Sequence, residues 1–140
     1  MNRQSIWLAM SYAWTEIGLD TSEYPGLAAV IDAAEHELDA FDGEALGVVC
    51  GAFALNTLLN LATLGMSMPD WGYDDEYVIK KVQKWRNRPL ILSLLNPLWL
   101  AGHPLITILV LGVWWKLRKA VVENIKARDE KAVPVNQTKV

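Results

Sequence analysis

The chain has 140 residues, which is enough for one domain with an appended segment but too few for two independent hydrophobic cores. Its formal charge of −3 conceals an asymmetry, because residues 1–79 carry −12 (1 − 13) and residues 80–140 carry +9 (12 − 3). So acidic a first part argues against nucleic-acid binding there.

Two amphipathic helices are expected first, over residues 4–17 and 25–42. Ile6, Met10, Ala13 and Ile17 share one face of the first helix, and Gly18 is suited to end it. In the second helix, the apolar positions are Leu27, Ile31, Ala34, Leu38 and Phe41.

Acidic residues form a separate stripe on the second predicted helix, at Asp32, Glu35, Asp39 and Asp42. We expect this stripe to bind a basic protein partner, although a solvated surface is the default interpretation of any run of like charges.

The segment from Ala45 to Pro69 has no charged residue over 25 positions. Asn56, Asn60 and several hydroxyl side chains interrupt it, so we favour a central buried helix of the acidic domain over a membrane span. After a loop, Asp74 or Asp75 is suited to cap a helix that runs to about Trp85.

Residues 89–115 lack charge over 27 positions, enough to cross a bilayer, for which ~20 apolar residues suffice. Tryptophan lies beside basic residues at both edges of this segment, which is typical of anchoring at a membrane interface. The predicted anchoring residues are Trp85, Arg86, Arg88, Trp99, Trp114, Trp115 and Lys116.

Asn96-Pro97 and Gly102-His103-Pro104 interrupt the middle of this segment. Five basic residues precede it and six follow it, so the positive-inside rule selects no direction for a single crossing. A kinked span and a re-entrant helical hairpin, with its turn between Asn96 and Pro104, both remain open. A pair of core helices in a soluble protein is the third interpretation.

Residues 116–131 are expected to form a basic amphipathic helix for an anionic membrane surface, with Leu117, Val121, Val122 and Ile125 on its apolar face. A disordered tail follows. The predicted fold is therefore all-α. It has an acidic helical domain (1–88), a membrane-embedded apolar helix or helical hairpin (89–115), and a basic amphipathic helix with its tail (116–140).

We expect no enzymatic activity, because the sequence has no nucleophile, phosphate-binding, metal or dinucleotide motif. Glu35, His36 and Glu37 are consecutive and point in different directions on a helix, so they predict no metal site. His103 is interpreted as a neutral turn residue and Cys50 as a buried thiol. No cofactor is expected.

Four short segments in the first 76 residues together form a pattern that is also found in other proteins. Residues 6–11, Val49-Cys50, residues 56–59 and residues 71–76 (WGYDDE) resemble an uncharacterised family of small helical bacterial proteins over residues 3–85. The resemblance implies a helical fold and carries no activity.

Two functions remain open. The chain is expected to be a membrane-associated binding protein, with an immunity protein that neutralises a basic toxin as the first hypothesis. The alternative is an accessory subunit of a larger membrane complex. In both cases we expect the bacterial inner membrane, with the N-terminal domain in the cytoplasm.

Overall fold

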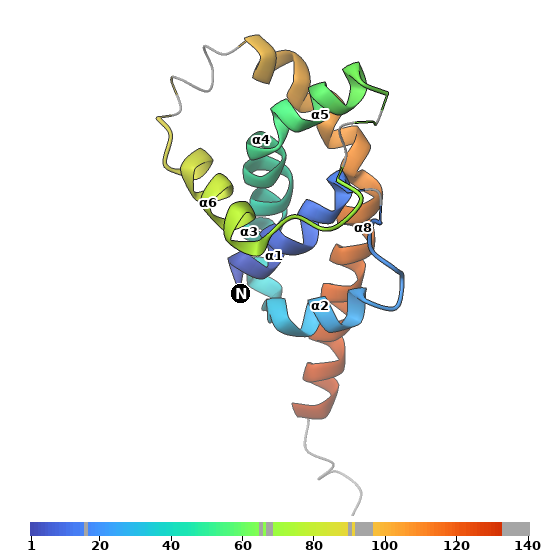
Figure 1. Cartoon of the computed structure of the whole chain (residues 1–140). Coiled ribbons are helices and arrows are strands. Elements are labelled where there is room, and N and C mark those ends of the chain that lie inside the picture. Colours follow the sequence, from blue (N-terminus) through green and yellow to red (C-terminus); the bar gives the residue numbers. More distant parts are fainter. Residues whose placement is uncertain (16, 65, 67–68, 90, 92–96, 133–140) are drawn as a thin grey trace, which may run out of the picture.

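The computed structural model describes residues 1–15, 17–64, 66, 69–89, 91 and 97–132, and every element within them is helical. The all-α prediction is confirmed for these residues. The last helix, α8 (Pro97–Ala132), is 36 residues long and runs the length of the molecule, with α2 beside one half of it and α5 beside the other (Figure 1).

The N-terminal helix is shorter than predicted. α1 (Arg3–Ser11) continues as a 3₁₀ turn, η1 (Tyr12–Trp14), and ends there. Ile6 and Met10 are fully buried, whereas Ile17 is 57% exposed, so the predicted face extends too far. Gly18 has the left-handed backbone (φ 63) that a chain reversal requires.

The prediction of one helix over residues 25–42 is wrong, because the chain turns at Asp32. α2 (Tyr24–Ile31) ends at Asp32, which has a left-handed backbone with φ 48. A 3₁₀ turn, η2 (Glu35–Glu37), and the short α3 (Leu38–Asp42) follow. Asp is among the few residues that tolerate this backbone, so the break leaves no glycine or proline signal in the sequence.

The chain after α3 forms three helical pieces that include most of the charge-free segment: a π-helix, η3 (Gly43–Val49), then α4 (Cys50–Ala52) and α5 (Ala54–Ala62). Its inner face carries Val49, Cys50 and Phe53, all fully buried, which confirms its place in the core. We expected this segment to be buried on all sides, but its outer face is exposed at Leu55 and Leu59.

α6 (Asp75–Arg86) begins and ends close to the predicted residues. The Asp74 carboxylate accepts a hydrogen bond from the backbone N–H of Tyr77 (3.1 Å), which confirms the predicted cap. Val78 and Val82 are fully buried and attach α6 to the core.

α8 overturns the predicted break at Gly102-His103-Pro104. Residues 97–104 are the first two turns of one continuous helix with Pro104 inside it, so no hairpin turn forms there. Asn96 lies outside the described residues. The predicted segment boundary at residue 115 also falls within α8. Packing explains this continuity, because Ile106 and Val110 are buried on the protein core directly after Pro104.

The basic half of α8 packs against the acidic part of the chain. Leu117, Val121 and Ile125, predicted to face a membrane surface, are buried in the protein core. That prediction is therefore wrong for the apolar face of residues 116–131. Asn124 adds a side-chain hydrogen bond to the carbonyl of Ala28 in α2 (3.3 Å).

Candidate functional site: an uncharged apolar end

The two charge-free stretches of the sequence lie side by side in the structure. α5 belongs to the stretch 45–69 and the first half of α8 to the stretch 89–115, and the two helices pack against each other (Figure 1). We call α5 together with residues 97–115 of α8 the apolar end. Pairing the two stretches concentrates uncharged sequence at one end of the molecule, and the apolar end meets the acidic α3 at its boundary, where Trp114 contacts Asp42.

Large aliphatic side chains cover the outside of the apolar end. Between 39% and 65% of each side chain is exposed at Leu55, Leu59, Leu105, Ile108, Leu109 and Leu111. Scattered exposed leucines are normal, but six large aliphatic side chains exposed on two packed helices make this end of the molecule a candidate interaction surface for a protein, a membrane or a ligand.

Several polar side chains of the apolar end have hydrogen-bond partners within the protein. Thr107 donates to the carbonyl of His103, and Thr63, directly after α5, donates to the carbonyl of Leu59, both at 2.8 Å. Thr57 accepts from the indole N–H of Trp14 (2.5 Å), and Asn56 donates to the hydroxyl of Tyr73 (3.1 Å). Helices in contact with lipid need this arrangement, because a bilayer supplies no hydrogen-bond partners.

A cavity of about 390 Å³ opens on the apolar end between η1, α5 and α8. Its lining includes Ala13, Trp14 and Val110, together with the polar Thr57 and Asn60. None of its lining residues carries a charge. A predominantly apolar pocket of this size is within the range of small-molecule sites.

The exposed face of α8 changes from apolar to basic at Trp115. Leu105, Ile108, Trp115, Lys119 and Lys126 follow one another at spacings of three, seven, four and seven residues, so they share one side of the helix. Trp115 is 61% exposed at the boundary. Tryptophan between an aliphatic and a cationic surface is the arrangement found at membrane interfaces.

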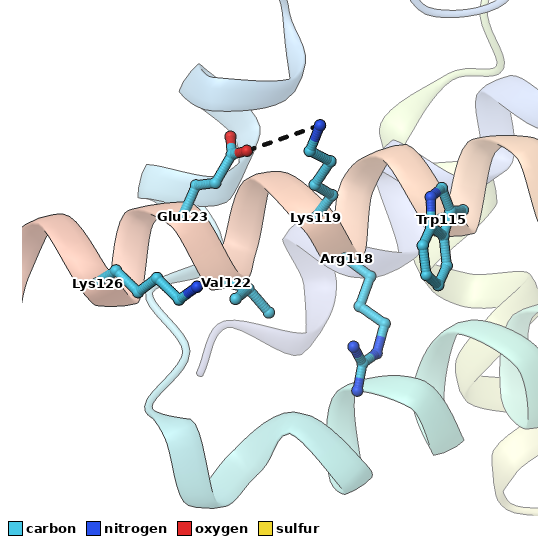
Figure 2. A pocket seen from close by; sticks show the side chains of 6 residues that line it. All are labelled: Trp115, Arg118, Lys119, Val122, Glu123 and Lys126. Atoms are coloured by element: carbon cyan, nitrogen blue, oxygen red, sulfur yellow. Dashed lines mark ion pairs between the residues drawn. The ribbon is translucent and has the colours of Figure 1, made fainter.

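A shallow groove of about 250 Å³ lies on the basic part of this face. Figure 2 shows its six lining side chains, all from α8, with Trp115 at one end and Lys126 toward the other. Lys119 forms an ion pair with Glu123 at 3.9 Å, and both side chains are about two-thirds exposed. Arg118 extends away from this pair (Figure 2) and binds Asp42.

The predicted anchoring residues divide between exposed and structural positions. Trp115 and Lys116 are exposed, as anchoring requires. Trp114 donates its indole N–H to Asp42 (2.9 Å), and the Trp85 ring packs against Gly51, so both serve the fold. Arg88 stacks on Trp85, with its guanidinium carbon 5.4 Å from the ring centroid. The side chain of Trp99 lies outside the described residues.

Arg86, another predicted anchoring residue, instead forms an ion pair with Glu44, an acid to which the sequence analysis assigned no role. Glu44 is only 7% exposed and accepts a hydrogen bond from the indole N–H of Trp7 at 2.9 Å. Its other oxygen lies 3.2 Å from Nε of Arg3 and 3.5 Å from a guanidinium nitrogen of Arg86. Glu44 thus connects α1, η3 and α6. The only sequence signal was a lone acid directly before 25 uncharged residues.

The predicted partner-binding acids do not form one stripe. Asp42 accepts two hydrogen bonds from Nε of Arg118, at 3.0 and 3.1 Å, in addition to the one from Trp114. Asp32 pairs with Arg128, whose guanidinium also donates to the carbonyl of Ala33. Glu35 and Asp39 are exposed on the intervening segment. Two of the four predicted acids therefore hold α8 in place.

Nucleophilic and metal-binding side chains do not gather in the part of the chain that the structure describes. No group of three His, Cys, Asp or Glu residues in it could hold a metal ion, and His36 is exposed. Cys50 is fully buried, and burial raises the pKa of its thiol to about 12, so it stays protonated at neutral pH.

Within the described residues, no single helix combines the length and hydropathy that crossing a bilayer requires. The segments Glu35–Ala52 and Ala54–Ala62, bent by 55°, reach that length and composition only as a pair.

No protein-family model matches the sequence, and neither a curated protein nor a solved structure matches it. The resemblance of residues 3–85 to a bacterial family stays a prediction.

Proposed function

We propose that this chain is a non-catalytic, membrane-associated binding protein that inserts its apolar end into one side of a lipid bilayer. The observation that carries the proposal is the pairing of the two charge-free stretches, with leucines outward and the hydrogen-bonded Thr57 and Thr107 turned toward the protein. The acidic part of the chain would remain in water. This arrangement requires partial insertion and no complete crossing.

The geometry is suited to shallow insertion. Residues 97–115 of α8 extend over about 28 Å and the nine residues of α5 over about 14 Å at 1.5 Å per residue. One leaflet contributes about half of the ~30 Å hydrocarbon core, which α5 matches in length. α8 would lie oblique to the surface, so that Trp115 reaches the interface and Lys119 the lipid headgroups.

The aliphatic side chains supply most of the binding free energy. Full burial of one Leu or Ile is worth about 1.5–3 kcal/mol, so six side chains that are roughly half exposed contribute on the order of 5–9 kcal/mol. Each basic residue near an anionic leaflet adds about 1 kcal/mol. Insertion should therefore depend more on the leucines than on salt concentration.

As the role of the bound protein, we propose capture of a basic protein partner, with a toxin-neutralising immunity protein as the first candidate class. Glu35 and Asp39 are exposed on the segment between the two acids that bind α8, which supports an acidic surface open to a partner. We also propose that the protein is located at the bacterial inner membrane, with its acidic domain in the cytoplasm. No catalytic or cofactor role is included.

An accessory subunit of a membrane complex is the second candidate, because the exposed leucines would also fit against the apolar helix of a partner protein. The two candidates differ in one requirement. Direct insertion needs lipid alone, whereas an accessory subunit needs its partner. Vesicles that contain no other protein therefore separate them.

The test is co-flotation of the purified full chain with vesicles of phosphatidylethanolamine and phosphatidylglycerol. We expect the wild type to float, and the double variant Leu105→Lys/Ile108→Lys to remain at the bottom of the gradient. The matched control is Val30→Lys, since Val30 is 59% exposed on α2, outside the apolar end, and should float like the wild type. A wild type that stays at the bottom would overturn insertion.

A further inference from the structure

We infer that the cavity between η1, α5 and α8 binds one aliphatic chain, supplied by a free fatty acid or by a phospholipid. The inference goes beyond membrane association, because a fatty acid in solution could fill the cavity without any bilayer. Three features of the cavity support it: its lining, its size and its mouth.

The lining selects an apolar ligand. Ala13, the Trp14 ring and Val110 present carbon atoms to the space. The indole N–H of Trp14 donates to the Thr57 hydroxyl (2.5 Å), which also lies 3.3 Å from the carbonyl of Phe53. Trp14 and Thr57 are thus paired without a ligand, and apart from Asn60 the other lining side chains are apolar, so a ligand gains free energy chiefly by burying apolar surface.

The size fits a chain of moderate length. A cavity of 150 Å³ accepts benzene, so the ≈ 390 Å³ available here would hold on the order of a dozen methylene and methyl carbons. Since none of the lining side chains is charged, the carboxylate or phosphate of the ligand would stay outside the mouth. The same chemistry therefore accepts a fatty acid or one tail of a phospholipid.

The mouth exposes large apolar side chains that an aliphatic ligand would cover. Leu61 and Leu109 are about half exposed, and Leu64 is 93% exposed. A ligand that shields these side chains from water gains free energy by the hydrophobic effect.

Trp14 provides the readout, because it lines the cavity and is only 2% exposed. A chain brominated near its middle quenches tryptophan fluorescence on contact. In the first arm, a brominated fatty acid is titrated into the full chain without vesicles. In the second arm, the chain binds vesicles whose phospholipid carries brominated tails. The contribution of Trp14 is the difference between the wild type and Trp14→Phe.

We expect quenching of Trp14 to saturate in at least one arm. Ala13→Phe fills the cavity and should weaken the saturable quenching at least tenfold. Leu109→Phe, at an exposed mouth position that tolerates a larger ring, should weaken it even if Ala13→Phe folds poorly. Ala62→Phe is the matched control, since Ala62 is exposed on α5 and does not line the cavity, and it should change the affinity less than twofold.

The two arms identify the source of the chain. Quenching by the fatty acid alone supports binding of a free acid, and quenching only in vesicles supports capture of a lipid tail. Lack of Trp14 quenching in both arms overturns the inference, as does quenching that Ala13→Phe and Leu109→Phe leave unchanged. The first arm contains no bilayer, so its result is independent of whether the protein floats with vesicles.

Discussion

Replacement of the buried Glu44 by alanine should destabilise the fold by about 1–4 kcal/mol. Truncation leaves the indole N–H of Trp7, itself only 3% exposed, without its acceptor, which costs about 1–3 kcal/mol. The ion pairs with Arg3 and Arg86 are also lost, but these side chains are 49% and 39% exposed and can turn to water, so the pairs add at most about 1 kcal/mol.

Glu44→Gln separates the two contributions. The amide oxygen can still accept from Trp7, so this variant should lose only the ion pairs, about 0.5–1 kcal/mol. Glu123→Ala is the control for an exposed pair, with Lys119, and should stay within about 0.5 kcal/mol of the wild type.

The assay is urea unfolding followed by circular dichroism at 222 nm. With a slope of about 2 kcal/mol per molar urea, Glu44→Ala should lower the midpoint by about 0.5–2 M. A midpoint no lower than that of Glu123→Ala would refute the argument that the buried hydrogen bond stabilises the junction of α1, η3 and α6. Equal midpoints for Glu44→Ala and Glu44→Gln would assign the whole effect to the arginines.

Three further predictions concern packing, protonation and the docking of α8. In Gly51→Ala, the new Cβ would lie 2.3 Å from the indole nitrogen of Trp85, so unfolding by urea should show a loss of about 1–3 kcal/mol; Gly112→Ala, with open space around it, should be neutral or slightly stabilising. The thiol of Cys50 should react with a disulfide reagent at pH 8 only as fast as the protein opens. Burial raises the pKa of this thiol from 9.0 to about 12, so the thiol ionises in the unfolded chain at a lower pH than in the folded chain. The free energy of unfolding should therefore fall as the pH rises between these two values, and it should fall less in Cys50→Ala. Identical pH profiles for the two proteins would contradict this. Asp42→Ala removes the acceptor shared by Trp114 and Arg118 and should accelerate hydrogen exchange in the second half of α8, whereas unchanged exchange would mean that apolar packing alone holds this helix.

Local signals in the sequence predicted the individual helices better than their junctions. The Asp74 cap and the buried Val78 and Val82 of α6 follow from residues within a few positions of one another, and the structure has them as expected. The turn at Asp32 and the continuity of α8 through Pro104 were not predictable in this way. In both cases packing against distant elements overrides the local preference.

The exposed apolar end was only half predictable for the same reason. Each charge-free stretch is plain in the sequence, but a stretch that reads as a core helix and one that reads as a membrane segment give no sign that they pair. In the structure the two stretches share one arrangement, with one face of each buried and the other exposed. The inner faces, with Phe53 and Val110, are core, and the outer faces, with Leu59 and Ile108, are exposed.

The opposite charges of the two parts of the chain did contain a tertiary signal. Asp32 and Asp42 are ten residues apart, and so are their partners Arg128 and Arg118, taken in the opposite order. Such pairing requires the segment 32–42 to run antiparallel to α8. Part of the asymmetry between −12 and +9 therefore reflects attraction within the molecule. Other bases of α8, among them Lys116, Lys119 and Lys126, are exposed, so they could meet an anionic surface at the edge of the apolar end.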